Sequence, residues 1–168
     1  YALPNIARAA TNIISDKSFD AEKILQIIET RQVTNFFAAP TMIKRLIDCP
    51  AFERYDLGSL RAVMYGGAPM LVDDLTNAMK KLGPCLVQLY GQGEAPMTIT
   101  YLSHEDHVLD GTPEQMKRLG SAGYARTGVE VGVVDAHDTL LPPGQMGEIV
   151  TRSDLVMKGY WNNPQATA

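Results

Sequence analysis

Short apolar runs alternate with amphipathic segments over the first 90 residues of the chain. The runs at 33–37, 60–67 and 85–90 are nearly continuous, which is typical of buried strands. Between them, apolar residues recur at helical spacing in 41–47 and 70–83, and the second segment ends in lysines and a glycine. This alternation predicts an α/β fold in which a parallel sheet is covered by helices on both faces, over about residues 1–119.

A further helix is predicted before the first strand. Asp20 is a suitable N-cap, because its side chain can accept a hydrogen bond from a free backbone N–H of the first turn. Ile24, Ile27 and Ile28 follow at a spacing that places them on one apolar face.

The pattern changes near Gly120. Polar and apolar residues alternate in VEVGVVDAHD at 129–138 and again in GEIVTR at 147–152, with a proline-glycine turn between them. Such alternation predicts antiparallel hairpins. We therefore expect two parts, an α/β unit over 1–119 and a β-rich segment over 120–168.

Composition narrows the classes of function. The net charge of -4 and the pI near 5.3 leave no basic field for a phosphate backbone, so no nucleic-acid partner is expected. No apolar run reaches the roughly 20 residues of a membrane span, and polar residues interrupt the first fourteen, which make a poor signal peptide. Cys49 and Cys85 have no neighbouring ligands and are expected to be buried thiols in a reducing, cytoplasmic setting.

Two strands end in loops that could carry chemistry, YGGAP at 65–69 and YGQGE at 90–94. Glycines let the backbone approach a flat ligand, a tyrosine offers a stacking face, and a carboxylate can hold Mg²⁺ on phosphates. Because ligands bind beyond the carboxyl ends of parallel strands, the two loops together predict a nucleotide pocket. The alternative for each loop alone is a tight turn with Tyr90 in the core and Glu94 in solvent.

Other motifs are excluded or assigned to structure. The dinucleotide fingerprint fails because Pro96 stands where its third glycine should be, and no segment has the spacing of a phosphate-binding P-loop. The segment 104–107, HEDH, places four possible ligands in one turn, but neighbouring side chains diverge, so a solvated helix start is expected there. Structural roles are also expected for Ser121 in a turn, for Trp161 in packing of the terminal loop, and for Met64, Met70, Met79 and Met97 in the core or a pocket lining.

Three blocks of the sequence resemble the adenylate-forming (AMP-binding) enzymes, a superfamily that includes acyl-CoA synthetases. The blocks are YGGAP at 65–69, YGQGE at 90–94, and GEIVTR followed by VMKGYWNNP at 156–164. The linking GSAG at 120–123 is also similar, so the resemblance spans nearly the whole chain. It implies that the chain is an internal part of the large N-terminal domain of such an enzyme.

The resemblance also implies roles for individual residues. The two loops would sandwich adenine, and Glu94 would hold Mg²⁺ on the phosphates of ATP. The expected nucleotide-binding residues are Gly66, Gly67, Ala68, Pro69, Tyr90, Gly91 and Gly93, and the expected lining of the acyl pocket is Gln92, Ala95, Pro96 and Met97.

The sequence departs from the family pattern in several places. Gly93 stands where the family usually has threonine or serine, so a hydroxyl contact to the α-phosphate is expected to be lost. The serine- and glycine-rich phosphate loop, the ribose-binding aspartate and the small C-terminal domain with the catalytic lysine have no counterpart in these 168 residues. We therefore expect the isolated fragment to be inactive.

The resemblance favours an acyl-CoA synthetase, an acid-thiol ligase that uses ATP, Mg²⁺ and coenzyme A. Such an enzyme joins a carboxylate to AMP with release of pyrophosphate, then forms the thioester with CoA, as in fatty acid metabolism. Gln92 stands where peptide synthetase adenylation domains usually have proline, which favours an acyl-CoA synthetase over that class. A peptide synthetase adenylation domain is the first alternative. The second is a degenerate relative that binds nucleotide without catalysis. The identity of the carboxylic acid substrate stays open, because short, long and aromatic acids all fit the sequence.

Overall fold

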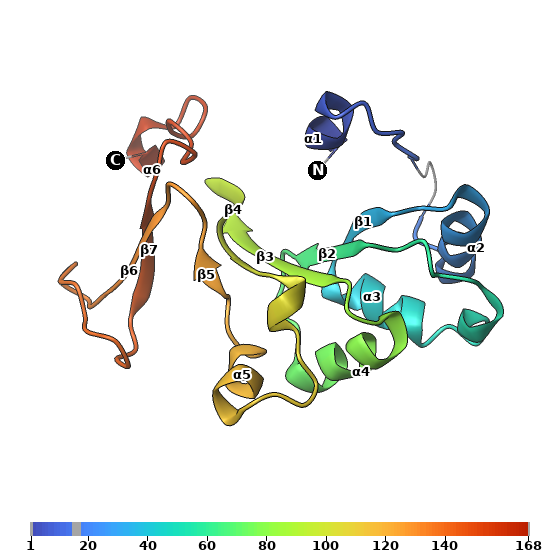
Figure 1. The fold of residues 1–168 in the computed structure, drawn as a ribbon. Coiled ribbons are helices and arrows are strands. Elements are labelled where there is room, and N and C mark those ends of the chain that lie inside the picture. Colours follow the sequence, from blue (N-terminus) through green and yellow to red (C-terminus); the bar gives the residue numbers. More distant parts are fainter. Residues whose placement is uncertain (1, 15–17, 168) are drawn as a thin grey trace.

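A computed structural model describes residues 2–14 and 18–167 of the chain. Its central feature is a five-stranded sheet in the order β1-β2-β3-β4-β5, and a separate two-stranded sheet pairs β6 with β7 (Figure 1). The strands are β1 Asn35–Ala38, β2 Ala62–Gly66, β3 Leu86–Gln92, β4 Ala95–Leu102, β5 Tyr124–Ala125, β6 Glu130–Val134 and β7 Glu148–Arg152.

Helices alternate with the first strands as the apolar pattern predicts. The α-helices are α1 Ala2–Ala7, α2 Ala21–Arg31, α3 Pro40–Ile47, α4 Val72–Leu82, α5 Pro113–Arg118 and α6 Pro164–Thr167, and two 3₁₀ turns cover η1 Phe52–Arg54 and η2 His104–Asp106. The predicted cap of α2 is confirmed, because Asp20 Oδ1 accepts a hydrogen bond of 3.0 Å from the Lys23 N–H. Leu25 and Ile28 are buried in this helix, whereas Ile24 and Ile27 are half-buried.

The hydrophobic core lies between one face of the sheet and the helices. Strands β1, β2 and β3 are parallel and neighbours in chain order, so their right-handed crossovers place α3 and α4 on the same face (Figure 1). Val63 and Leu86 point into this core and are fully buried. Met64 and Val87, which alternate with them on the opposite face, are half-buried. The predicted parallel sheet flanked by helices is confirmed, and α3 and α4 both lie on the core face of β1, β2 and β3.

The α/β fold class with a parallel part and an antiparallel part is confirmed, but antiparallel pairing begins earlier than predicted. β4 folds back on β3 directly after residues 93–94, and the register shifts between Tyr90 and Gln92. β5 then adds to β4, also antiparallel, although it follows Gly120. The division of the chain at residue 120 stays a prediction.

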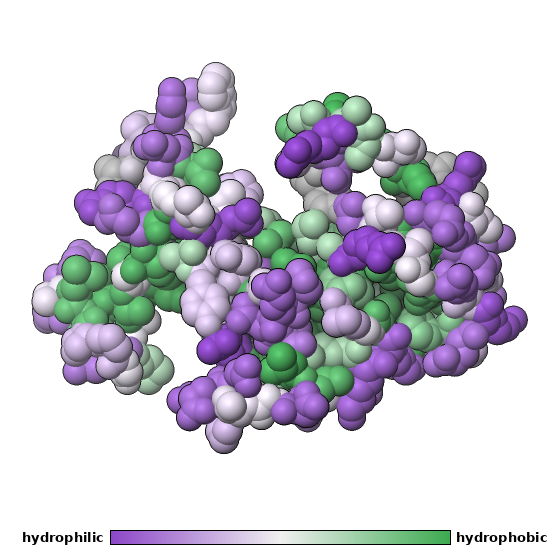
Figure 2. Space-filling view, viewed as in Figure 1, coloured by the Kyte–Doolittle hydropathy of each residue, from purple (hydrophilic) through white to green (hydrophobic). Residues whose placement is uncertain are grey.

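Apolar side chains also reach the surface. Figure 2 shows them gathered over the β6–β7 sheet, where the exposed residues include Val131, Leu140, Ile149 and Val150. Within residues 2–14 and 18–167, none of the helices has both the length and the apolar character needed to cross a membrane.

Candidate functional site

A cavity of about 380 Å³ lies at the carboxyl ends of β2 and β3. Its volume falls in the range of small-molecule sites, and within residues 2–14 and 18–167 no charged side chain lines it. The lining residues are Tyr65, Gly67, Ala68, Pro69, Met70, Gln88, Leu89, Tyr90, Gly91, Leu119, Gly120, Ser121 and Ala122. The cavity thus brings together most of the two predicted loops, and its neutral, partly aromatic wall suits a flat heterocycle better than a phosphate chain.

The wall at 119–122 was missed as a site by sequence reasoning. Thr100 Oγ1 donates a hydrogen bond of 2.5 Å to the carbonyl of Ala122, which fixes this wall to β4. Ser121 makes the predicted turn, because its hydroxyl donates to the Arg118 carbonyl at 2.7 Å and accepts from the Gly123 N–H at 3.1 Å. The glycines that flank this turn, Gly120 and Gly123, are the signal in the sequence that could have indicated a close approach, and at Gly123 the approaching group is the Tyr101 carbonyl.

Tyr65 forms the deepest polar contact at this end of the sheet. Its side chain is buried in the core, and its hydroxyl lies 2.9 Å from Nε2 of His107. Nδ1 of the same ring lies 2.6 Å from the Ser103 carbonyl, which can only accept, so Nδ1 carries the proton and Nε2 accepts from Tyr65. His107 therefore ties the loop after β4 to the end of β2.

Burial keeps both members of this pair neutral. Desolvation raises the pKa of the Tyr65 hydroxyl. Desolvation also lowers the pKa of His107, against the opposing effects of its bond to Ser103 and of the nearby Asp106 charge. The prediction of a solvated helix start at 104–107 is wrong for His107, which is 5% exposed, because the 3₁₀ turn directs this ring into the core.

Two of the predicted nucleotide-binding glycines serve chain packing. A Cβ on Gly66 would lie 2.2 Å from the Leu89 carbonyl oxygen, and a Cβ on Gly91 would lie 2.2 Å from the Met97 nitrogen. Gly67 differs, because it has a φ of +81° and is exposed at the cavity. The glycines at 66 and 91 are thus required by neighbouring strands, whether or not a ligand is present.

Gly93 and Glu94 form the turn between β3 and β4, two and three residues after the cavity-lining Gly91 and outside the lining themselves. A Cβ on Gly93 would meet nothing within 4 Å, so there is room for a larger side chain at this position. The Glu94 carboxylate accepts a hydrogen bond from the Tyr160 hydroxyl, and the Glu94 carbonyl accepts one of 2.8 Å from the Met157 N–H. The hydrogen bond from Tyr160 lowers the pKa of Glu94, whereas the carboxylate raises the pKa of Tyr160.

Glu94 is the side chain whose chemistry fits the predicted Mg²⁺. The described residues hold no cluster of three or more His, Cys, Asp or Glu side chains that could bind a metal ion by itself. Mg²⁺ needs no such cluster, because it is commonly held by one or two carboxylates together with substrate phosphates and water. A single half-buried carboxylate three residues after the cavity-lining Gly91 is compatible with that pattern.

The predicted acyl-pocket residues lie in the same hairpin, outside the lining of the cavity. Ala95 is buried, whereas Gln92 and Pro96 are exposed. Met97 is half-buried and has a φ of +59°, and its side chain reaches within 4 Å of the Cβ positions of Gly66 and Gly67. Their role toward an acyl group stays a prediction.

The other sequence expectations have mixed outcomes. Met79 is buried in the core and Met70 lines the cavity, as predicted for pliable side chains. Cys85 is a buried free thiol, but Cys49 is only half-buried. Trp161 is 92% exposed, so the prediction that it packs the terminal loop is wrong; its neighbour Tyr160 makes that contact instead.

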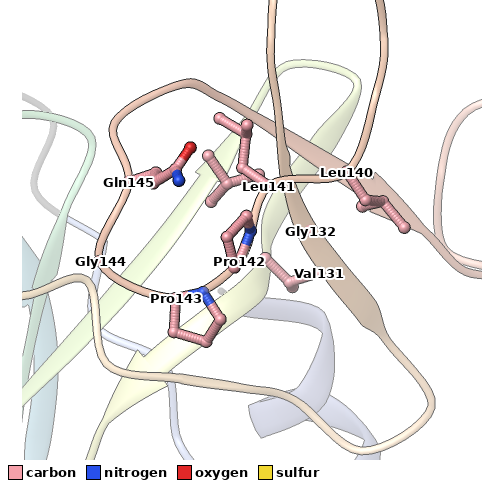
Figure 3. A pocket seen from close by; sticks show the side chains of 9 residues that line it. Val131, Gly132, Leu140, Leu141, Pro142, Pro143, Gly144 and Gln145 are labelled. Carbon is pink, nitrogen blue, oxygen red and sulfur yellow. The ribbon is translucent and has the colours of Figure 1, made fainter.

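A second cavity of about 370 Å³ lies between β6 and the loop that follows it (Figure 3). Its lining is Val131, Gly132, Val133, Leu140, Leu141, Pro142, Pro143, Gly144 and Gln145. These residues offer no titratable or nucleophilic side chain, so the cavity at β2 and β3 is the better candidate for chemistry.

The chain is similar to known proteins in sequence and in fold. The family model described as AMP-binding enzyme matches residues 2–161. Among solved structures, the amide bond synthetase McbA from Marinactinospora thermotolerans is similar with a TM-score of 0.79 and 34% identity, over 89% of this chain and 29% of its own. The N-terminal domain of FACL13 from Mycobacterium tuberculosis is similar with a TM-score of 0.79 and 30% identity, over 97% of this chain and 39% of its own.

Curated relatives match the chain over its full length. The medium/long-chain-fatty-acid–CoA ligase FadD8 of Mycobacterium tuberculosis is 36% identical over 168 residues, which are 100% of this chain and 28% of that protein. The feruloyl-CoA synthase of an Amycolatopsis species is 35% identical over 166 residues, 99% of this chain and 32% of that protein. The chain spans less than a third of the length of these two relatives. With the family model matched along almost its entire length, the chain belongs to the AMP-binding enzymes.

Proposed function

We propose that the protein containing this chain is an ATP-dependent acyl-CoA synthetase. It would join a carboxylate to the α-phosphate of ATP, releasing pyrophosphate, and then pass the acyl group from the adenylate to the thiol of CoA, releasing AMP. The observation that carries the proposal is the neutral cavity at the ends of β2 and β3, which gathers Gly67, Ala68 and Tyr90 in a chain of the AMP-binding family. The relatives named as a CoA ligase and a CoA synthase support CoA as the acceptor of the acyl group.

In this proposal the cavity holds the base and the adjoining turn serves the phosphates. The ring of Tyr90 and the backbone of Gly67 and Ala68 bind adenine, which is uncharged and needs no ionic partner. Glu94 holds Mg²⁺, which supplies charge neutralisation when bound. Because Gly93 has no side chain, the hydroxyl contact that the family makes there is missing. A free thiol at Cys85 is compatible with the cytoplasmic setting that we propose.

The proposal is tested by carboxylate-dependent exchange of pyrophosphate into ATP, measured on the full-length protein over a panel of short, long and aromatic acids. Glu94→Gln is expected to lower exchange about 100-fold or more, because an uncharged amide is a weaker ligand for Mg²⁺ at the phosphates. Glu53→Gln makes the same chemical change at an exposed site in η1 and is expected to leave the exchange rate unchanged.

Two results would count against the proposal. Undiminished exchange in Glu94→Gln would remove Glu94 from the metal role. Exchange without any CoA thioester product, with CoA supplied, would instead favour an adenylation enzyme of another class.

A further inference from the structure

Tyr160 is the side chain through which the C-terminal segment meets Glu94. Its hydroxyl donates a hydrogen bond to Glu94 Oε1 across 66 positions of sequence. Three residues earlier, the Met157 N–H donates to the Glu94 carbonyl at 2.8 Å. The C-terminal segment therefore holds Glu94 by two hydrogen bonds, one to its backbone carbonyl and one to its carboxylate.

The local fold of the C-terminal segment fixes the position of the Tyr160 backbone. The Tyr160 N–H donates to Thr167 Oγ1 at 3.0 Å, and the same hydroxyl donates to the Asn163 carbonyl at 2.8 Å. Gly159 has a φ of +149°, and a Cβ there would lie 2.4 Å from Thr167 Cγ2. The chain can pass close to α6 only because residue 159 is glycine, and this passage sends Tyr160 toward the β3–β4 turn.

The contact is suited to orienting a carboxylate without neutralising it. In the part of the chain that the structure describes, Glu94 forms no ion pair, and the phenol is its one side-chain partner. A neutral donor on Oε1 keeps the negative charge and restricts rotation of the group, which leaves Oε2 for another ligand. Hydrogen bonds of this kind to metal-binding carboxylates strengthen metal binding.

We propose that Tyr160 is a positioning residue for Glu94, holding Oε1 so that Oε2 meets a divalent cation on the phosphates of a bound nucleotide. This inference rests on the proposed function, because it takes Glu94 as the metal-binding group.

The test measures binding of ATP to the full-length protein by calorimetry, once with Mg²⁺ and once with EDTA. Tyr160→Phe removes only the hydroxyl and is expected to weaken binding with Mg²⁺ about 10- to 100-fold. Binding in EDTA is expected to stay unchanged, which also shows that the variant is folded. The free Mg²⁺ concentration that gives half-maximal pyrophosphate exchange should rise by the same factor.

Matched variants separate the possible outcomes. Tyr124→Phe removes the hydroxyl of an exposed tyrosine whose ring lies beside Arg118, and it is expected to behave as wild type. If Glu94→Gln loses the Mg²⁺ dependence while Tyr160→Phe keeps it, the positioning role is refuted and the proposed function stands. If Glu94→Gln also keeps it, Glu94 has no metal role and the positioning role of Tyr160 is refuted with it, whereas the proposed function is still decided by carboxylate-dependent exchange and thioester formation. Tighter Mg²⁺ binding in Tyr160→Phe would identify the phenol as a competitor of the metal and overturn the inference.

Discussion

His107 and Tyr160 show how single side chains acquire roles that their neighbours in sequence do not reveal. His107 ends a run of five polar residues, 103–107, yet its ring is buried against Tyr65, 42 positions away. Tyr160 stands beside Trp161, the larger and more conspicuous aromatic residue, yet the tyrosine makes the contact to Glu94 and the tryptophan stays exposed. Both roles follow from hydrogen bonding of a polar group that the fold encloses or approaches.

The buried His107 makes stability depend on pH. Because desolvation lowers its pKa in the folded state, the unfolded chain binds a proton more readily, and the free energy of unfolding should decrease as pH falls below about 6.5. His107→Gln is expected to lose this part of the pH dependence and to be less stable at pH 7 by about 1–3 kcal/mol, since the Tyr65 hydroxyl loses its ring partner. Urea denaturation between pH 5 and 7.5 measures both effects.

His137→Gln is the matched control for this experiment, because His137 lies in an exposed turn. The control should retain the pH dependence of wild type. A pH dependence in His107→Gln equal to that of wild type would contradict the assignment of His107 as a buried neutral ring.

The glycines of β2 and of the β3–β4 turn differ in what surrounds them. The Leu89 carbonyl can pack against Gly66 because this residue has no Cβ, whereas a Cβ at Gly93 would meet no atom within 4 Å. A glycine in a motif therefore indicates close approach, but the approaching group can be another strand as well as a ligand.

Alanine substitution distinguishes these two cases. Gly66→Ala places a Cβ 2.2 Å from a backbone oxygen, so the strands must separate, and we expect a loss of about 1–3 kcal/mol in the free energy of unfolding. Gly93→Ala meets no atom within 4 Å and needs no positive φ, so its stability should be unchanged or higher by up to about 1 kcal/mol. Equal urea midpoints for the two variants would contradict this packing.

The candidate site is assembled from both halves of the chain. The cavity is built by β2, β3 and the loop at 119–122, while the carboxylate of Glu94 is held by the segment at 157–160. Among the residues that the structure describes, no lysine or arginine lines the cavity. Transfer at a phosphate depends on neutralising its charge, so the cavity is better suited to binding an uncharged group than to catalysing that transfer.

Residues 1–168 purified alone are accordingly expected to give no acyl-CoA from any acid in the panel, assayed by formation of the thioester with ATP, Mg²⁺ and CoA. The full-length protein in the same assay is the positive control. Robust thioester formation by the 168 residues would show that their own side chains suffice for the chemistry.

The strands, the helices and the family could be predicted from the sequence. Strand and helix positions follow from apolar periodicity and from caps such as Asp20, and the two loops at 65–69 and 90–94 were recognisable because their spacing is local. Folding alone determined the turn at residues 93–94 that pairs β4 with β3, and the contacts of His107 and Tyr160. The physical reason is that periodicity records only whether a side chain is buried, whereas its partner is set by chain segments that meet 42 or 66 residues apart.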